Sequence, residues 1–198
     1  MPPVRRGILA VTALLLASLA VAQPDEARTA FEREDYVVAA ALYRPRAEQG
    51  EAEAQYRLGM MLRFGWGVDK DAAAAAAMLR RAAEQNHPLA QAELGTMYRL
   101  GRGVPEDPRE AARLLRAAAG AGVGIAQLSI GRMYRDGIGV AKDPVEAYAW
   151  FQLAGENSVM DGFAFRAELA QTMTEQQLAA ARMLAAERAQ TIQKDARK

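Results

Sequence analysis

The sequence predicts an all-α fold, specifically a right-handed α/α superhelix, or solenoid, of about five antiparallel helix pairs. Three observations support this prediction: an internal repeat of 36 residues, apolar residues at helical spacing within each repeat, and glycine or aspartate where helices should end and begin. Of the 198 residues, 51% are hydrophobic and 44 are alanine, the strongest helix former. The composition therefore favours a helical domain with a sizeable core.

The residue types that the sequence lacks exclude several kinds of site. It contains no cysteine and a single histidine, His87, so we expect no disulfide, no thiol nucleophile, no metal site and no histidine-centred triad. The net charge of +1 offers no bulk attraction for nucleic acid or for an acidic membrane surface. We therefore predict a protein that works by contact with another protein or peptide, without a cofactor or a nucleic-acid partner.

Residues 1–22 have the pattern of a cleaved secretory signal peptide. Arg5 and Arg6 precede an uncharged apolar run whose end carries the small residues Ala20 and Ala22. We expect cleavage after position 22 on the general (Sec-type) export route, and a periplasmic or secreted protein with no membrane insertion afterwards. The alternative is an uncleaved anchor, but the apolar run is at the short edge of the roughly 17 to 25 residues that a spanning helix needs.

Residues 51–158 contain three repeats that align without gaps. Each has an alanine-glutamine pair, an aliphatic residue before a glycine, a methionine, an arginine, a G-x-G-V string and an aspartate at the same relative positions. We interpret the repeated glycines and aspartates as structural. They are Gly59, Gly65, Gly67 and Asp71 in the first repeat, Gly95, Gly101, Gly103 and Asp107 in the second, and Gly131, Gly137, Gly139 and Asp143 in the third.

Each repeat is predicted to form two antiparallel helices, a helix A and a helix B. In the second repeat, helix A is expected from about Pro88 to Leu100, and Gly101 ends it in a left-handed conformation. Val104 is expected to fill the gap between the two helices. Glycine inside helix A, as at Gly95, costs about 1 kcal/mol relative to alanine. We therefore expect helix B to approach helix A closely at these glycines.

Helix B is predicted to begin at an aspartate cap. Asp107 would accept the first free amides and Glu110, three residues later, would complete a capping box. Asp143 and Glu146 repeat the pattern in the third repeat. Asp71 keeps the cap in the first repeat, where a run of alanines follows it.

Residues 23–50 and 159–198 are predicted to be atypical terminal helix pairs that cover the ends of the solenoid. The N-terminal pair lacks the glycine-rich loop. At the C-terminal end, residues 159–172 resemble another helix A, and Thr174 should cap a long last helix. The total is ten helices in one domain.

The repeated string A-Q-x-x-L-G-x-M-Y-R-x-G-x-G-V-x-x-D-P-x-E-A resembles the Sel1-like repeat (SLR), a relative of the tetratricopeptide repeat, in its secreted bacterial form. The resemblance implies an α/α superhelix that acts as an adaptor in signalling complexes, in the bacterial envelope or at host contacts. Some cysteine-rich relatives are associated with penicillin binding or β-lactam hydrolysis. This sequence departs from them because it has no cysteine.

An arginine recurs at one position of every repeat, as Arg63, Arg99 and Arg135. Stacking would bring the three to one side, where they would bind acidic side chains of a partner. In the other interpretation, each arginine caps the end of helix A or pairs with a nearby loop acid. The second interpretation is favoured, because a residue that recurs in every unit of a repeat protein is more often structural.

Positions that differ between repeats are better candidates for specific binding. Trp66 lies on a loop tip and would be either a binding anchor or a packing residue. Arg57, Glu93 and Ser129 occupy one position of helix A whose residue type differs between repeats. This varying row either lines a concave face that binds a partner or is simply exposed to solvent. His87, in a turn between repeats, is expected to be solvated rather than to hold a metal.

The leading functional hypothesis is a non-enzymatic protein–protein interaction scaffold or adaptor in the bacterial cell envelope, one version of which regulates an envelope sensor. One alternative is a hydrolase of a β-lactam or cell-wall substrate. Beyond residue 22 its nucleophile would have to be Ser129 or Ser158, and neither lies in an S-x-x-K or G-x-S-x-G string. The other alternative is an envelope structural protein that binds glycan.

Overall fold

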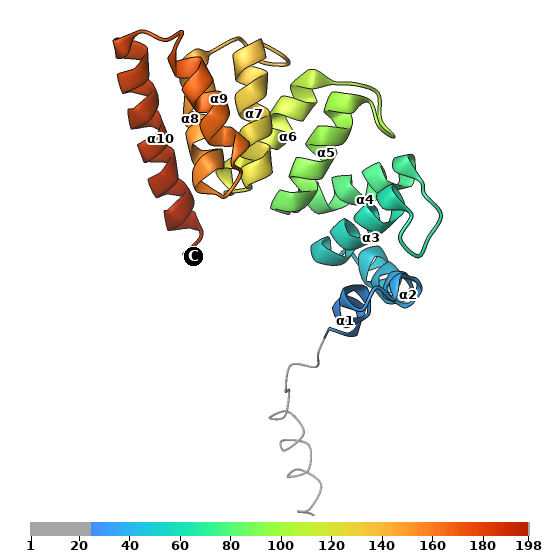
Figure 1. Ribbon diagram of the computed structural model, residues 1–198. Helices are drawn as coiled ribbons and strands as arrows, with labels where there is room; N and C mark the ends of the chain where they lie inside the picture. Colours follow the sequence, from blue (N-terminus) through green and yellow to red (C-terminus); the bar gives the residue numbers. More distant parts are fainter. Residues whose placement is uncertain (1–24, 198) are drawn as a thin grey trace, which may run out of the picture.

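The computed structural model describes residues 25–197, and every regular element within them is an α-helix, as the sequence predicts (Figure 1). The predicted signal peptide at residues 1–22 lies outside the described residues. The ten helices of this described part are α1 (Glu26–Glu32), α2 (Tyr36–Glu48), α3 (Ala52–Phe64), α4 (Ala72–Glu84), α5 (Pro88–Leu100), α6 (Pro108–Gly120), α7 (Gly124–Asp136), α8 (Pro144–Glu156), α9 (Asp161–Ala170) and α10 (Glu175–Asp195). No helix of this part of the chain combines the length and apolar character needed to cross a membrane.

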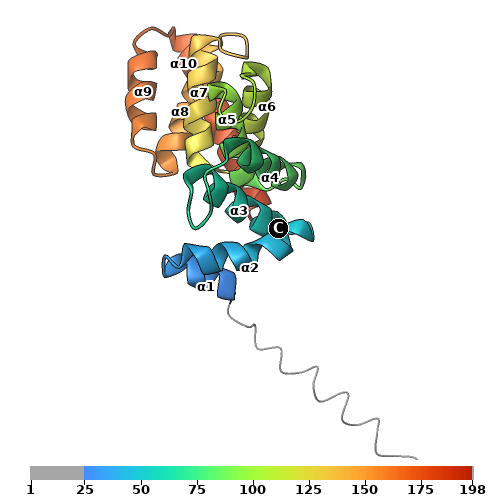
Figure 2. The same cartoon turned by 90° about the vertical axis from the view of Figure 1, so that its right-hand side faces the viewer.

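The helices from α1 to α8 form four consecutive pairs that stack into a curved array (Figures 1 and 2). Each pair packs internally, and the second helix of each pair packs on the first helix of the next. The solenoid predicted from the repeat is therefore confirmed. In each repeat the first helix (α3, α5, α7) is helix A and the second (α4, α6, α8) is helix B.

The helix ends follow the local signals of the sequence. Helix α5 spans the predicted residues, and Gly101 ends it with φ of 61°. The Asp107 carboxylate accepts the backbone N–H groups of Arg109 and Glu110, each at 3.0 Å. Asp71 and Asp143 cap α4 and α8 in the same way.

The predicted capping boxes at α6 and α8 are wrong in their glutamate half. Glu110 does not reach back to the helix start but accepts two hydrogen bonds from Arg113, at 2.8 and 2.6 Å. Glu146 accepts from Arg188 of α10 and from the Trp150 indole. A guanidinium offers a carboxylate two charge-assisted hydrogen bonds, which are stronger than one bond to a backbone amide.

The glycines inside helix A lie where helix B crosses closely. A Cβ on Gly95 would be 2.9 Å from Leu115 Cγ and 3.2 Å from the Ala111 carbonyl oxygen. Gly59 faces Leu79 and Gly131 faces Phe151 in the same manner. Each repeat thus packs a large side chain of helix B directly onto the backbone of helix A.

A buried glutamine joins each repeat to the preceding helix pair. The side-chain amide of Gln127 donates to the carbonyl of Ala119, the second-to-last residue of α6, at 3.1 Å. Gln55 and Gln91 bond Ala47 and Ala83 in the same way, at 3.1 and 3.3 Å. All three glutamines are buried.

At the opposite end of each interface between a repeat and the preceding helix pair, a glycine contacts the backbone of the preceding pair. Gly139, at φ of 70°, would place a Cβ 2.0 Å from the carbonyl oxygen of Pro108, the first residue of α6. Gly67 and Gly103 lie equally close to Tyr36 and Ala72 at the starts of α2 and α4. The glycine-rich loop therefore touches the backbone of the previous helix B.

The fifth pair differs from the other four. Helix α10 packs against α8 rather than against α9, and α9 packs on another side of α8 (Figure 2). Arg188 fixes α10 through two hydrogen bonds of 2.8 Å to Glu146, with its guanidinium 4.2 Å from the centre of the Trp150 ring. Ile192 packs against the same core cluster as Trp150. The two terminal helices are therefore splayed, with α8 between them.

We expect Gln127→Ala to lower the free energy of unfolding by roughly 1–3 kcal/mol, because it removes a buried hydrogen bond between repeats and leaves a cavity. Chemical denaturation followed by circular dichroism measures this change. The exposed Gln193→Ala is the control and should lie within about 0.5 kcal/mol of the wild type. Equal effects of the two substitutions would show that the buried amide does not hold the repeats together.

We expect Gly139→Ala to destabilise the protein more than Gly137→Ala. Both glycines have nearly equal positive φ, 70° and 73°, so both substitutions cost about 1–2 kcal/mol in backbone strain. Only at Gly139 does the added Cβ meet a backbone carbonyl at 2.0 Å, whereas at Gly137 its nearest neighbour is Lys142 Cβ at 3.3 Å. The overpacking should add about 2 kcal/mol or more. Matching unfolding midpoints for the two variants would contradict the close contact between repeats.

Candidate functional site

Helices α3, α5 and α7 share a groove of about 270 Å³, which we call the helix A groove. Phe64 and Ile125 are its most exposed apolar residues, with 46% and 57% of their surface accessible. Its lining comprises Arg63, Phe64, Ala92, Glu93, Thr96, Leu115, Ile125, Ala126 and Ser129. Glu93 and Ser129 belong to the row that differs between repeats, so two members of that row do line a groove.

The three recurring arginines have different surroundings. Arg63 forms an ion pair with Glu93, which connects α3 to α5 inside the groove. Arg99 is exposed and makes no hydrogen bond or ion pair with any other residue from 25 to 197. Arg135 pairs with its neighbour Asp136 at 2.7 Å and holds the pKa of that carboxyl below its ordinary value through the hydrogen bond.

The pattern of these pairs follows from the varying row. The partner of Arg63 is Glu93, thirty residues later, and the residue thirty positions after Arg99 is Ser129, which has no charge. Among the described residues, none of the three arginine side chains hydrogen-bonds the carbonyls at the end of its helix. Their role in partner binding therefore remains a prediction that concerns Arg63 most directly, since Arg63 lines the groove.

Arg57 lies outside the groove lining and belongs to a cluster with Glu53 and His87. Its Nε donates to Glu53 at 2.5 Å, and its guanidinium lies 5.6 Å from the centre of the Tyr56 ring. Burial raises the pKa of the Glu53 carboxyl, but hydrogen bonds from His87 and Arg57 outweigh it and hold this pKa below its ordinary value of 4.5. This cluster joins α3 to the start of α5.

The expectation that His87 is solvated is wrong. Its side chain is 13% exposed, stacks on Tyr56 at 4.8 Å and caps α5 by accepting the Ala90 N–H at Nδ1. Because Nδ1 accepts, the proton of the neutral ring is on Nε2, which donates to Glu53 at 2.9 Å. Sequence reasoning missed this role because the partner lies 34 residues earlier in the chain.

Trp66 packs in an aromatic cluster instead of extending from the loop. Its ring stacks on Phe64 at 4.7 Å and on Tyr36 at 5.8 Å, and meets the edge of Phe31 at 5.7 Å. Phe64 is therefore the member of the cluster that faces the groove. Sequence reasoning named Trp66 and missed Phe64 and Ile125, although both are apolar residues at positions that differ between repeats.

Ser129, the candidate serine nucleophile that lines the groove, uses its hydroxyl in a hydrogen bond within its own helix. The Ser129 hydroxyl donates to the carbonyl of Ile125, one turn earlier in α7, at 2.8 Å. Residues 25–197 contain no group of three or more histidine, cysteine, aspartate or glutamate side chains placed to hold a metal. What the groove offers is an exposed apolar surface beside one ion pair.

The family model described as Sel1 repeat matches residues 52–87, 88–123 and 124–159. No match was found among curated proteins.

The similar solved structures include two Sel1-type repeat proteins. One is c5321, described as a protective antigen present in uropathogenic Escherichia coli strains and displaying an SLR fold, with 34% identity and a TM-score of 0.73 over 78% of this chain and 33% of that one. The other is a Sel1 repeat protein from Oxalobacter formigenes, with 28% identity and a TM-score of 0.68 over 71% of this chain and 58% of that one. This chain thus spans about a third of the first protein and less than two thirds of the second.

The depressed pKa of Glu53 predicts a pH dependence of stability. A carboxyl whose pKa is lower in the folded state stabilises the fold fully above its unfolded value, and this contribution is lost as the pH falls through the folded value. Between about pH 5 and pH 3, the wild type should therefore lose more stability than Glu53→Gln, which has no charge to lose. Urea unfolding at several pH values measures the difference. Parallel pH profiles of the two proteins would exclude a contribution from this cluster.

Proposed function

Since the chain belongs to the Sel1 repeat family, whose members generally mediate protein–protein interaction, we propose that it is a protein-binding module that uses the helix A groove. The observation that carries this proposal is the combination of two exposed apolar residues, Phe64 and Ile125, with an ion pair in one groove built from three repeats.

The groove suits a peptide segment or the face of a helix. Its walls are helices fixed by buried contacts, so binding requires little ordering of the protein. Apolar partner side chains would cover Phe64 and Ile125, and a polar partner group would contact the pair of Arg63 and Glu93. Positions that differ between repeats would then determine which partner binds.

We further propose that the protein works as an adaptor in the bacterial cell envelope, where its partner would be an envelope sensor or complex. The signal-like pattern of residues 1–22 supports this location. No observation on the described residues favours the hydrolase or the glycan-binding alternative.

The test is site-specific photo-crosslinking in cells. A photoreactive amino acid at Ile125 should crosslink one defined protein, and the same amino acid at Met183, an exposed position on α10 at 75%, should not. Adding Phe64→Asp should abolish the crosslink because it places a charge against the apolar partner surface, and circular dichroism should show that the variant keeps the fold although it loses the stacking on Trp66. Crosslinking that persists with Phe64→Asp, or equal products from both positions, would contradict binding in the groove.

A further inference from the structure

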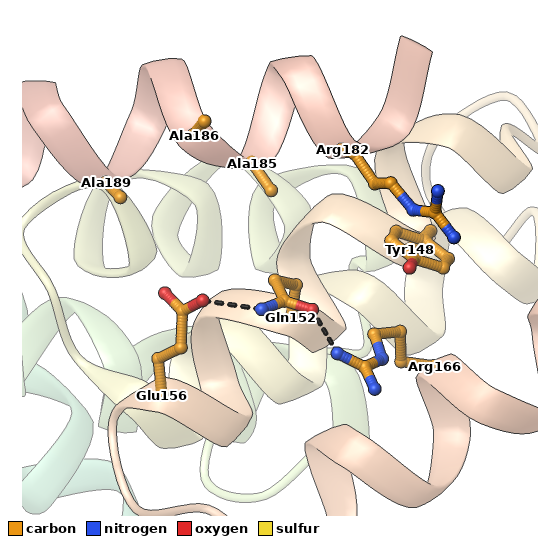
Figure 3. A pocket seen from close by; sticks show the side chains of 8 residues that line it. All are labelled: Tyr148, Gln152, Glu156, Arg166, Arg182, Ala185, Ala186 and Ala189. Carbon is orange, nitrogen blue, oxygen red and sulfur yellow. Dashed lines mark hydrogen bonds between the residues drawn. The ribbon is translucent and has the colours of Figure 1, made fainter. Parts of the chain in front are cut away.

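A second cleft lies where the terminal helices separate. It has a volume of about 430 Å³ and is bounded by α8, α9 and α10 (Figure 3). Arg166 from α9 and Arg182 from α10 enter it from opposite sides, with Tyr148 of α8 between them.

Arg166 occupies a position that is a buried aliphatic residue in each of the three repeats. In the 36-residue register, Arg166 is equivalent to Leu58, Leu94 and Ile130, which are buried in core clusters shared with the preceding helix pair. An arginine at this position cannot be buried in the same way unless it is paired. Because α10 does not pack on α9, Arg166 extends into the cleft instead.

The cleft holds hydrogen-bond donors that lack acceptors. The Tyr148 ring is buried, and its hydroxyl makes no hydrogen bond within the described chain. Because no fully buried side-chain oxygen of residues 25–197 lacks a partner, this hydroxyl reaches the surface of the cleft. Arg182 likewise has no hydrogen-bond or ion-pair partner there. The Arg166 side chain donates only to the Gln152 amide oxygen, which leaves most of its five donors unused.

The arrangement of polar groups along the cleft suits a peptide. Tyr148, Gln152 and Glu156 lie on one stripe of the helix, and two turns of α-helix separate its ends by about 12 Å. Both arginines lie toward the Tyr148 end, while Glu156, which accepts from Gln152 at 2.5 Å, marks the other end. An extended segment of about four residues covers this length. The alanines of α10 leave room for a backbone along one wall.

We propose that this cleft binds the carboxylate of an extended peptide segment. Arg166, Arg182 and the Tyr148 hydroxyl would donate to the carboxylate, and Glu156 would contact a basic residue about three positions away. Charge-assisted hydrogen bonds from guanidinium groups favour carboxylates in this geometry. The site is separate from the helix A groove and does not depend on the function proposed for that groove.

The experiment uses a fluorescent tetrapeptide that begins with lysine, continues with two alanines and ends in aspartate with a free carboxyl terminus. Fluorescence polarisation should show binding that weakens with salt and disappears when aspartate is replaced by asparagine and the terminus is amidated. Arg182→Gln should weaken binding about tenfold and Tyr148→Phe several-fold, because each removes a donor to the carboxylate. Arg81→Gln, which removes an exposed arginine from α4, is the matched control and should bind as the wild type does.

Circular dichroism establishes that each variant is folded, and Tyr148→Phe keeps the buried ring in place. The proposal is overturned if the acidic peptide does not bind at millimolar concentration, or if Arg182→Gln and Tyr148→Phe bind it like the wild type. It is also overturned if inorganic phosphate saturates the site in a manner that depends on Arg182 while the peptide does not bind, since the ligand would then be a small oxyanion.

Discussion

The stacking of the helix pairs depends on one buried side chain in each repeat, the glutamine in the first turn of helix A. Gln127 inserts its amide into the last turn of α6, where the Ala119 carbonyl already accepts the backbone N–H of Gly122 and has a second lone pair to offer. A buried amide without an acceptor would cost about 1–3 kcal/mol, so the glutamine is compatible with only a narrow range of helix positions. It therefore restricts both the distance and the rotation between neighbouring repeats.

The glycine contact at the other end of the interface completes this restriction. With Gly139 against Pro108 and Gln127 against Ala119, each repeat touches both ends of the preceding helix B. Alanines between these two points add little volume, so the helices approach closely along their length. An interface fixed at two points gives every repeat the same orientation, and this common orientation brings side chains of α3, α5 and α7 into one groove.

Local signals predicted the helices well because the signals act over a few residues. Gly101 and Asp107 determine where α5 ends and α6 begins, and no distant residue competes for their conformations. The hydrogen-bond partners of side chains that can reach several groups were predicted poorly. Glu146 had an acceptable local partner in the sequence, but Arg188 of α10 reaches it from 42 residues away. His87 was assigned to solvent because its contacts with Glu53 and Tyr56 exist only after the repeats stack.

The same distinction explains what the sequence revealed of the candidate site. The 36-residue register identified the varying row, two members of which line the groove, since register fixes which residues share a face. The register did not show that the Trp66 ring packs against three other aromatic rings. Two of these rings belong to the N-terminal helix pair, which lacks the repeat pattern. The importance of Phe64 follows from that packing and not from its own position alone.

The departure of the last pair from the repeat gives the protein two surfaces of different chemistry. The helix A groove is apolar around an ion pair that is already formed, so a partner gains there mainly by covering hydrophobic area. The cleft beside α8 exposes donors without acceptors, so a ligand gains there by supplying negative charge. Because the stacking fixes α7 and α8 relative to each other, the two surfaces keep a constant separation. A partner that carries an apolar segment and an acidic segment at this separation would bind the second site at a high effective concentration once the first is occupied. If both proposed sites are used, rigid stacking would contribute to partner selection, since a partner with the same two segments at another spacing would not occupy both sites together.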